Sequence, residues 1–145
     1  MQDVLAWRVA DAMTYRPPHV NPHTSLAVAQ ELLARPGIDC LPVADDGMLV
    51  GVVTGFDLLK AFALPEGTRS TAVVLTPVSC VMTDAPVTVR PDTPLERAVQ
   101  LLLTTGHRSL PVTIGALLIG VLTRANALRL LRGAAAERAA ERAPA

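Results

Sequence analysis

The chain of 145 residues lacks most features that mark secreted, membrane-embedded or nucleic-acid-binding proteins. It has two cysteines, Cys40 and Cys80, which form neither a CxxC pair nor a metal-ligand spacing, so we expect reduced, mostly buried thiols in a cytoplasmic protein. Its apolar runs are far shorter than the roughly 20 residues that a membrane-spanning helix needs. Thirteen basic and thirteen acidic residues cancel, which argues against a nucleic acid or an anionic membrane as partner.

Signatures of catalysis and of metal binding are also missing. The sequence contains neither a Walker loop nor a GxGxxG, and nothing in it indicates a nucleophilic triad. His19 and His23 lie four residues apart, which suits a metal when both are on one helix, but Asn21-Pro22 disfavours a single helix there. We therefore predict no catalytic residue, no metal ligand and no required cofactor.

What the chain does contain is an internal repeat. When Met13 is laid on Met82, a shift of 69 positions, residues 13–59 match residues 82–128 without a gap. Prolines, glycines and threonines fall in one register over this whole span, which chance does not produce. Two copies of one unit predict a pseudo-twofold body with paired clefts.

Each copy reads as strand, helix, strand, strand, helix. In copy one the apolar periodicity and the turn residues predict an extended segment at 18–20, a helix at 25–35, strands at 40–44 and 49–53, and a helix at 55–62. In copy two, Thr93, Pro94 and Glu96 form a capping-box pattern that opens a helix ending near Thr105. Strands at 109–112 and 117–122 and a helix from Thr123 to about Arg132 follow.

These elements divide the chain into five segments. The two repeats are joined by a segment that Pro65, Gly67 and Pro77 interrupt, and the C-terminal segment is rich in alanine, glutamate and arginine. The predicted segments are a lead-in helix at 1–12, repeat one at 13–62, a linker at 63–79, repeat two at 80–132, and a frayed or disordered tail at 133–145.

The order of the short motifs resembles a known family. Met-Thr-x-x-Pro, Pro-x-Thr, Leu-Pro-Val and Gly-h-h-Thr, where h is an apolar residue, occur twice in this order across about residues 10–132. This resembles the cystathionine-β-synthase (CBS) domain pair, or Bateman module. The resemblance implies an α/β (α+β) fold of tandem βαββα repeats packed about a pseudo-twofold axis. It also implies a non-enzymatic sensor whose clefts between the repeats bind AMP, ADP, ATP or S-adenosylmethionine as a regulatory ligand.

The ligand motif of that family, Gly-h-h-Thr/Ser-x-x-Asp, is complete in copy one at residues 51–57. The resemblance assigns Asp57 to the ribose hydroxyls and Thr54 to a phosphate or a nearby ligand oxygen. Without a ligand, the same two residues read as a capping box at a helix start. Copy two has Thr123 and then Asn126 in place of the acid, and an amide oxygen accepts a hydrogen bond without the charge that strengthens it.

Basic residues stand near the second motif. His107 and Arg108 precede a predicted strand and resemble a phosphate clamp; alternatively they are a helix C-cap and a solvated surface charge. Copy one has Ile38-Asp39 at these positions, so we expect its cleft to prefer ligands with little phosphate charge. Thr14 and Thr83 either approach the ligand's adenine or ribose across the opposite cleft or are simple turn hydroxyls.

The function predicted from these observations is that of a stand-alone regulatory module. It binds an adenosine compound and signals to an unknown protein in trans. The alternative is a structural or dimerisation module with vestigial, ligand-free clefts. A homodimer is expected because the closing helices carry many apolar residues: Leu58, Leu59, Phe62, Leu64, Leu128, Leu130 and Leu131.

Overall fold

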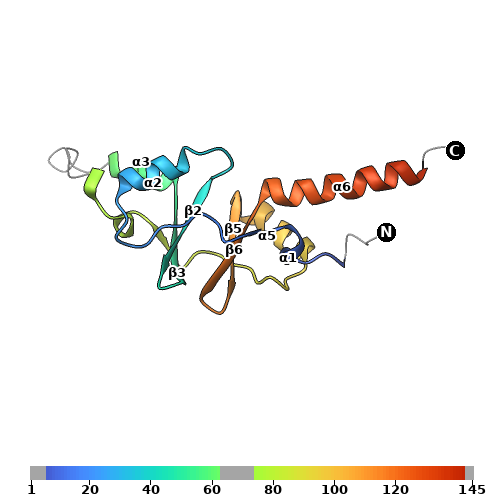
Figure 1. The fold of residues 1–145 in the computed structure, drawn as a ribbon, viewed down its shortest axis with the longest axis horizontal. Helices are drawn as coiled ribbons and strands as arrows, with labels where there is room; N and C mark the ends of the chain where they lie inside the picture. The colour runs from blue at the N-terminus through green and yellow to red at the C-terminus, as the bar shows by residue number, and fades with distance from the viewer. Residues whose placement is uncertain (1–5, 63–73, 143–145) are drawn as a thin grey trace. The chain divides into compact units, whose positions relative to one another are not determined.

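The computed structural model describes residues 6–62 and 74–142, whose helices and strands are drawn in Figure 1. They form two compact units, and neither coincides with one sequence repeat. The first unit comprises the described residues of Met1–Arg16, Thr88–Ile114 and Ile119–Ala145, and the second those of Pro17–Val87 and Gly115–Leu118. Within the described residues, no helix has the length and apolar character to cross a membrane.

The second unit is built on a β-hairpin. Strands β2 (Cys40–Asp45) and β3 (Met48–Thr54) pair antiparallel, and the residues between them, Asp46 and Gly47, have φ of 54° and 82°. Positive φ at both positions is what a type I′ turn requires. The other elements of this unit are α2 (Leu26–Leu33), α3 (Gly55–Phe62), the 3-10 helix η3 (Val78–Cys80) and β4 (Thr83–Asp84). Because β4 pairs antiparallel with β3, the Met-Thr segment of repeat two lies on repeat one.

The first unit has the same arrangement with the two copies exchanged. Its paired strands are β5 (Ser109–Ile114) and β6 (Leu117–Thr123). Strand β1 (Thr14–Tyr15) pairs antiparallel with β6, so the Met-Thr segment of repeat one lies on repeat two. The helices of this unit are α1 (Val9–Ala12), α5 (Leu95–Thr105) and α6 (Arg124–Arg142).

Residues that lie 69 positions apart in the sequence make equivalent contacts in the two units. A parallel bridge joins Val20 to Val43 in the second unit, and the corresponding bridge joins Val89 to Val112 in the first. Each unit has its own hydrophobic core, and the two cores use matched positions. The matched core pairs include Val20 and Val89, Leu26 and Leu95, Ala29 and Ala98, Leu41 and Leu110, and Val53 and Leu122.

A glycine in each unit admits the Met-Thr segment of the other copy. A Cβ placed on Gly51 would lie 2.8 Å from the Met82 sulfur and 2.8 Å from the Thr83 carbonyl oxygen. A Cβ on Gly120 would lie 2.5 Å from the Thr14 carbonyl oxygen. Real side chains do not come so close, so a glycine is needed at both positions for the short strands β4 and β1 to pair.

The predicted fold class is confirmed: the chain is a mixed α+β protein with antiparallel strand pairs. The hairpins and the helix at 55–62 lie where the sequence places them. The predicted capping box at Thr93 is wrong. The Thr93 hydroxyl accepts from the Arg90 N–H at 3.0 Å, and Pro94 is the N-cap of α5 without a side-chain bond.

The ends of the chain also differ from expectation. The helix α6 continues from Arg132 to Arg142, because alanine, glutamate and arginine are strong helix formers and Ala134 is buried in the first unit's core. Within the described part of the lead-in segment, α1 begins only at Val9, since the carbonyl of Trp7 accepts from the Leu95 N–H and Arg8 is extended. Residues 1–5 of this segment and 63–73 of the predicted linker lie outside the described residues.

Candidate functional site

The motif of copy one builds a cap on helix α3. Thr54 ends strand β3, and Asp57 lies in the first turn of the helix that starts at Gly55. The Thr54 N–H donates to Asp57 Oδ2 at 2.9 Å, and the Asp57 N–H donates to Thr54 Oγ1 at 3.3 Å. This reciprocal pair is a capping box, so the capping role that the sequence left open is realised in the structure. It also fixes the carboxylate in one orientation.

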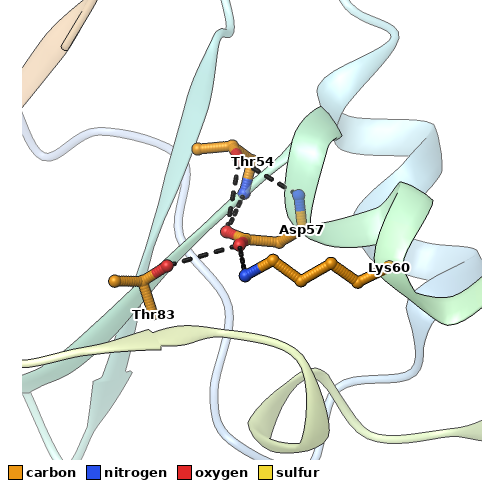
Figure 2. Close-up of polar contacts among 4 residues, drawn as sticks. All are labelled: Thr54, Asp57, Lys60 and Thr83. Carbon is orange, nitrogen blue, oxygen red and sulfur yellow. Dashed lines mark hydrogen bonds and ion pairs between the residues drawn. The ribbon is translucent and has the colours of Figure 1, made fainter. Parts of the chain in front are cut away.

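Two more residues complete what we call the Asp57 cluster: Thr54, Asp57, Lys60 and Thr83 (Figure 2). The Thr83 hydroxyl, on strand β4, donates to Asp57 Oδ1 at 3.3 Å. The Lys60 ammonium, one turn along α3, lies 2.8 Å from the same oxygen. The cluster therefore joins residues from both sequence repeats inside one unit, with Asp57 only 2% exposed.

Lys60 is a basic residue of this site that the sequence analysis did not identify. The prediction compared only the loop positions Ile38 and Asp39 with His107 and Arg108. The signal that could have identified Lys60 was its spacing, since a base three residues after an acid lies on the same helix face. The site of copy one thus contains one acid and one base, in contact.

The corresponding Asn126 cluster of the first unit comprises Thr14, Thr123 and Asn126. The Thr123 N–H donates to Asn126 Oδ1 at 3.1 Å, and the Asn126 N–H donates to Thr123 Oγ1 at 3.0 Å. The Thr14 hydroxyl is 3.4 Å from the same amide oxygen. The capping geometry of copy one is therefore repeated with a neutral side chain in place of the carboxylate.

His107 and Arg108 are exposed and lie beside this second cluster. The link is Arg124, the first residue of α6, whose backbone N–H donates to the Arg108 carbonyl at 2.9 Å. Its guanidinium donates to the carbonyls of His107 at 3.1 Å and of Gly106 at 2.9 Å. Sequence reasoning missed Arg124, which stands where copy one has Gly55. It holds the loop of the predicted clamp against the start of α6.

A cysteine lies next to the Asp57 cluster. Cys40 pairs with Thr54 across the β2–β3 ladder. Burial, with smaller contributions from the negative charges of Asp57 and Asp39, raises the pKa of the Cys40 thiol from 9.0 to about 12. The thiol is consequently protonated at neutral pH and a poor nucleophile. Cys80 is exposed, contrary to the expectation that both thiols are buried, because it lies in the surface helix η3.

In residues 6–62 and 74–142, no three His, Cys, Asp or Glu side chains are placed to share an ion. Every buried side-chain nitrogen or oxygen in these ranges has a hydrogen-bond partner. The chemistry offered by the described clusters is thus hydrogen bonding and charge at two helix starts.

Comparison with known proteins places this geometry in a family. The family model for the CBS domain matches twice, at residues 9–64 and 78–133. The chain is 36% identical over 149 aligned residues to the chloroplastic CBS domain-containing protein CBSX2 of Arabidopsis thaliana, covering 85% of this chain and 63% of that protein. It is 38% identical over 119 residues to the CBS domain-containing protein DDB_G0289609 of Dictyostelium discoideum, covering 77% of this chain and 82% of the relative.

A solved structure of a relative is similar in fold. The crystal structure of CBSX2 in complex with AMP superposes with a TM-score of 0.77 at 40% identity, covering 88% of this chain and 97% of the crystallised one. The chain covers 63% of the full length of CBSX2. With both repeats matched by the family model, the chain belongs to the CBS domain family and carries two copies of its domain.

Proposed function

We propose that this chain binds an adenosine compound at the Asp57 cluster and reports its presence to another protein, with AMP the best-supported ligand. The observation that carries the proposal is the cluster itself: a buried carboxylate held at a helix start and completed by Thr83 from the other repeat. Its support from outside is CBSX2, a relative at 40% identity that has been crystallised with AMP.

The chemistry of the cluster suits a nucleoside. A carboxylate is an acceptor with about four lone-pair positions, so it matches two vicinal hydroxyl donors of a ribose. The start of α3 presents backbone N–H groups and the positive end of the helix dipole, which favour a phosphate. One residue thereby serves two roles, because Asp57 caps the helix with Oδ2, and Oδ1, which Thr83 and Lys60 contact in this structure, is the oxygen that we assign to the ligand.

The Asn126 cluster is the weaker half of the proposal. Its acceptor is an amide without charge, while Arg124 and the exposed Arg108 supply positive charge nearby. We propose that this cluster tolerates ligands with more phosphate than AMP, such as ADP or ATP. S-adenosylmethionine, which carries a positive sulfonium, suits these surroundings less well.

The proposed protein signals its bound state to a partner protein and associates with itself. The proposed function includes no catalytic step. Leu59 and Leu128 occupy matched positions on α3 and α6 and are 64% and 58% exposed, which supports a homodimer. The surface is smaller than the sequence indicates, since Leu58 packs against the second core and Leu130 and Leu131 against the first. Leu64, also expected there, lies outside the described residues.

Titration calorimetry of AMP into wild type, Asp57→Ala and Asn126→Ala tests the site. Removing the carboxylate should weaken one binding event by about 10- to 100-fold, because hydrogen bonds to a charged group contribute roughly 1.5–3 kcal/mol. Asn126→Ala is the matched control, since it removes the corresponding side chain from the other cluster. Unchanged binding in Asp57→Ala would refute the assignment.

A purely structural module is the competing function, and one observation favours it. Both oxygens of Asp57 already accept hydrogen bonds from the chain's own donors. Thermal melting separates the two functions, because a ligand at a hundredfold excess over its dissociation constant stabilises a protein by about 2.7 kcal/mol. No shift with AMP, ADP, ATP or S-adenosylmethionine would favour the structural module.

A further inference from the structure

Lys60 occupies the position that a ligand would need on Asp57. Both the Lys60 ammonium, at 2.8 Å, and the Thr83 hydroxyl, at 3.3 Å, contact Oδ1 of the carboxylate (Figure 2). The other oxygen, Oδ2, accepts from the backbone N–H and the hydroxyl of Thr54. With two donors on each oxygen the carboxylate is saturated. A ribose hydroxyl can bind Asp57 only after one of these donors leaves.

The donor that can leave most easily is the ammonium. The Thr54 N–H is fixed by the backbone of the α3 cap, and losing its bond would uncap the helix. The Lys60 side chain is 48% exposed and the Asp57 side chain 3% exposed, so water can replace the carboxylate around the ammonium. The pair has one buried and one half-exposed partner, and the flexible, half-exposed lysine is easier to displace from the carboxylate than a backbone donor is.

We infer that Lys60 is the specificity-determining residue of the Asp57 cluster, because it yields Oδ1 to a ribose and then favours ligands that carry an anionic group. This inference rests on the proposed function. Once neutral hydroxyls replace it on the carboxylate, the ammonium remains tethered one helical turn away without an anionic partner. A phosphate on the ligand restores that partner, whereas a neutral adenosine leaves it in water and a sulfonium repels it.

Lys60 has a second neighbour on α3, the ring of Phe56. Its ammonium lies 5.6 Å from the centre of the Phe56 ring, a cation–π distance that holds it beside the first turn of α3. That turn is where helix amides favour a phosphate. A displaced ammonium and the helix start therefore act on the same anionic group.

The other repeat provides an internal comparison. Arg129 stands at the position equivalent to Lys60, one turn after Asn126. Asn126 Oδ1 accepts from Thr123 and Thr14, and within the described residues no hydrogen bond or ion pair joins it to Arg129. The displacement step thus belongs to copy one alone, which makes Arg129→Met a matched control.

Calorimetry with two probes, adenosine and AMP, tests the inference on wild type, Lys60→Met, Lys60→Arg and Arg129→Met. Lys60→Met removes a competitor, so adenosine should bind about two- to fivefold more tightly, the range expected for losing a half-exposed ion pair. AMP should lose affinity relative to adenosine, lowering the preference for AMP over adenosine by roughly fivefold or more. Lys60→Arg should retain the preference, and Arg129→Met should leave it unchanged.

The outcomes distinguish this inference from the proposed function. If Lys60→Met changes the affinities for adenosine and AMP by the same factor, Lys60 has no role in selectivity and the inference is wrong. If wild type binds neither probe, or if Asp57→Ala binds both normally, the proposed function fails and the inference fails with it. Circular dichroism melting of each variant checks that a loss of binding is not a loss of fold.

Discussion

The Asp57 and Asn126 clusters share a backbone and differ in charge. In both, a threonine at the end of a strand and a residue in the first helical turn cap each other, and a threonine from the other repeat adds a third contact. In copy one the acceptor is an anion with a bound lysine; in copy two it is a neutral amide beside Arg124. A duplicated scaffold therefore keeps its geometry while the charge of its two clusters differs.

The largest expected effect tests the shared scaffold. Gly51→Ala and Gly120→Ala should each destabilise the protein by about 1–3 kcal/mol, because the new Cβ would overlap the Met-Thr segment on the neighbouring strand. We expect Gly120→Ala to be the more severe, since its Cβ would lie 2.5 Å from a backbone oxygen. Urea unfolding at equilibrium measures both changes in the free energy of unfolding.

Gly133→Ala is the control for these two variants. Gly133 lies inside α6 with nothing within 4 Å of its added Cβ, so this change should stabilise the helix by roughly 0.5–1 kcal/mol. Destabilisation by all three variants alike would show a general sensitivity to glycine replacement. Gly51→Ala or Gly120→Ala proteins as stable as wild type would contradict the close approach of the strands.

Exchanging the two acceptor residues sharpens the comparison. Asp57→Asn should lower the free energy of unfolding by about 1–2 kcal/mol. If the amide oxygen accepts from the Thr54 N–H, the NH₂ group must face the Lys60 ammonium, and two hydrogen-bond donors then oppose each other. Asn126→Asp should instead stabilise by about 0.5 kcal/mol, since an acid in the first turn of α6 interacts well with the helix dipole and with Arg129.

Chemical denaturation at low and high salt measures this pair of variants. Because the gain in Asn126→Asp is electrostatic and position 126 is partly exposed, added salt should reduce the gain. The Asp57→Asn loss should persist, because it comes mainly from hydrogen bonds of a buried side chain. Equal destabilisation by both variants would mean that the two clusters do not differ in charge preference.

The repeat made much of the fold predictable. The shift of 69 positions places matched core residues, hairpins and helix starts, because these depend on local patterns of apolar, turn and capping residues. The extent of α6 was not predictable in this way, since Gly133 reads as a stop in a helix whose other residues favour continuation. Thr93 reads as a cap, but its hydroxyl is bonded to the Arg90 N–H upstream.

The charges of the candidate site were harder to predict than its scaffold. Thr54, Asp57, Thr123 and Asn126 follow from the repeated motif, and the structure brings each pair together. Lys60 and Arg124 belong to no motif, and the groups that they contact depend on the conformation of two long, flexible side chains. Arg124 contacts the carbonyls of His107 and Gly106, which are distant in sequence and which spacing does not encode. Lys60 contacts Asp57 three residues earlier, so its spacing could have identified it.

The smallest expected effect concerns Cys40, whose counterpart in copy two is Ser109. Folding raises the pKa of the thiol from 9.0 to about 12. At a pH between these two pKa values, the thiol is deprotonated in the unfolded chain and protonated in the folded protein. The unfolded state then binds fewer protons, and the free energy of unfolding must fall as pH rises through this window. Below pH 9.0 the contribution is fully present.

Cys40→Ser, which copies the residue of the other repeat, should remove this part of the alkaline loss of stability. We expect its unfolding free energy to decline less than that of wild type just above pH 9.0, by below about 1 kcal/mol at the mildly alkaline pH that folding measurements allow. Comparison with wild type cancels the other groups that titrate there, and Cys80→Ser, which alters an exposed thiol, is the matched control. Parallel pH profiles for Cys40→Ser and wild type would mean that the thiol beside Asp57 is hydrated in the folded protein.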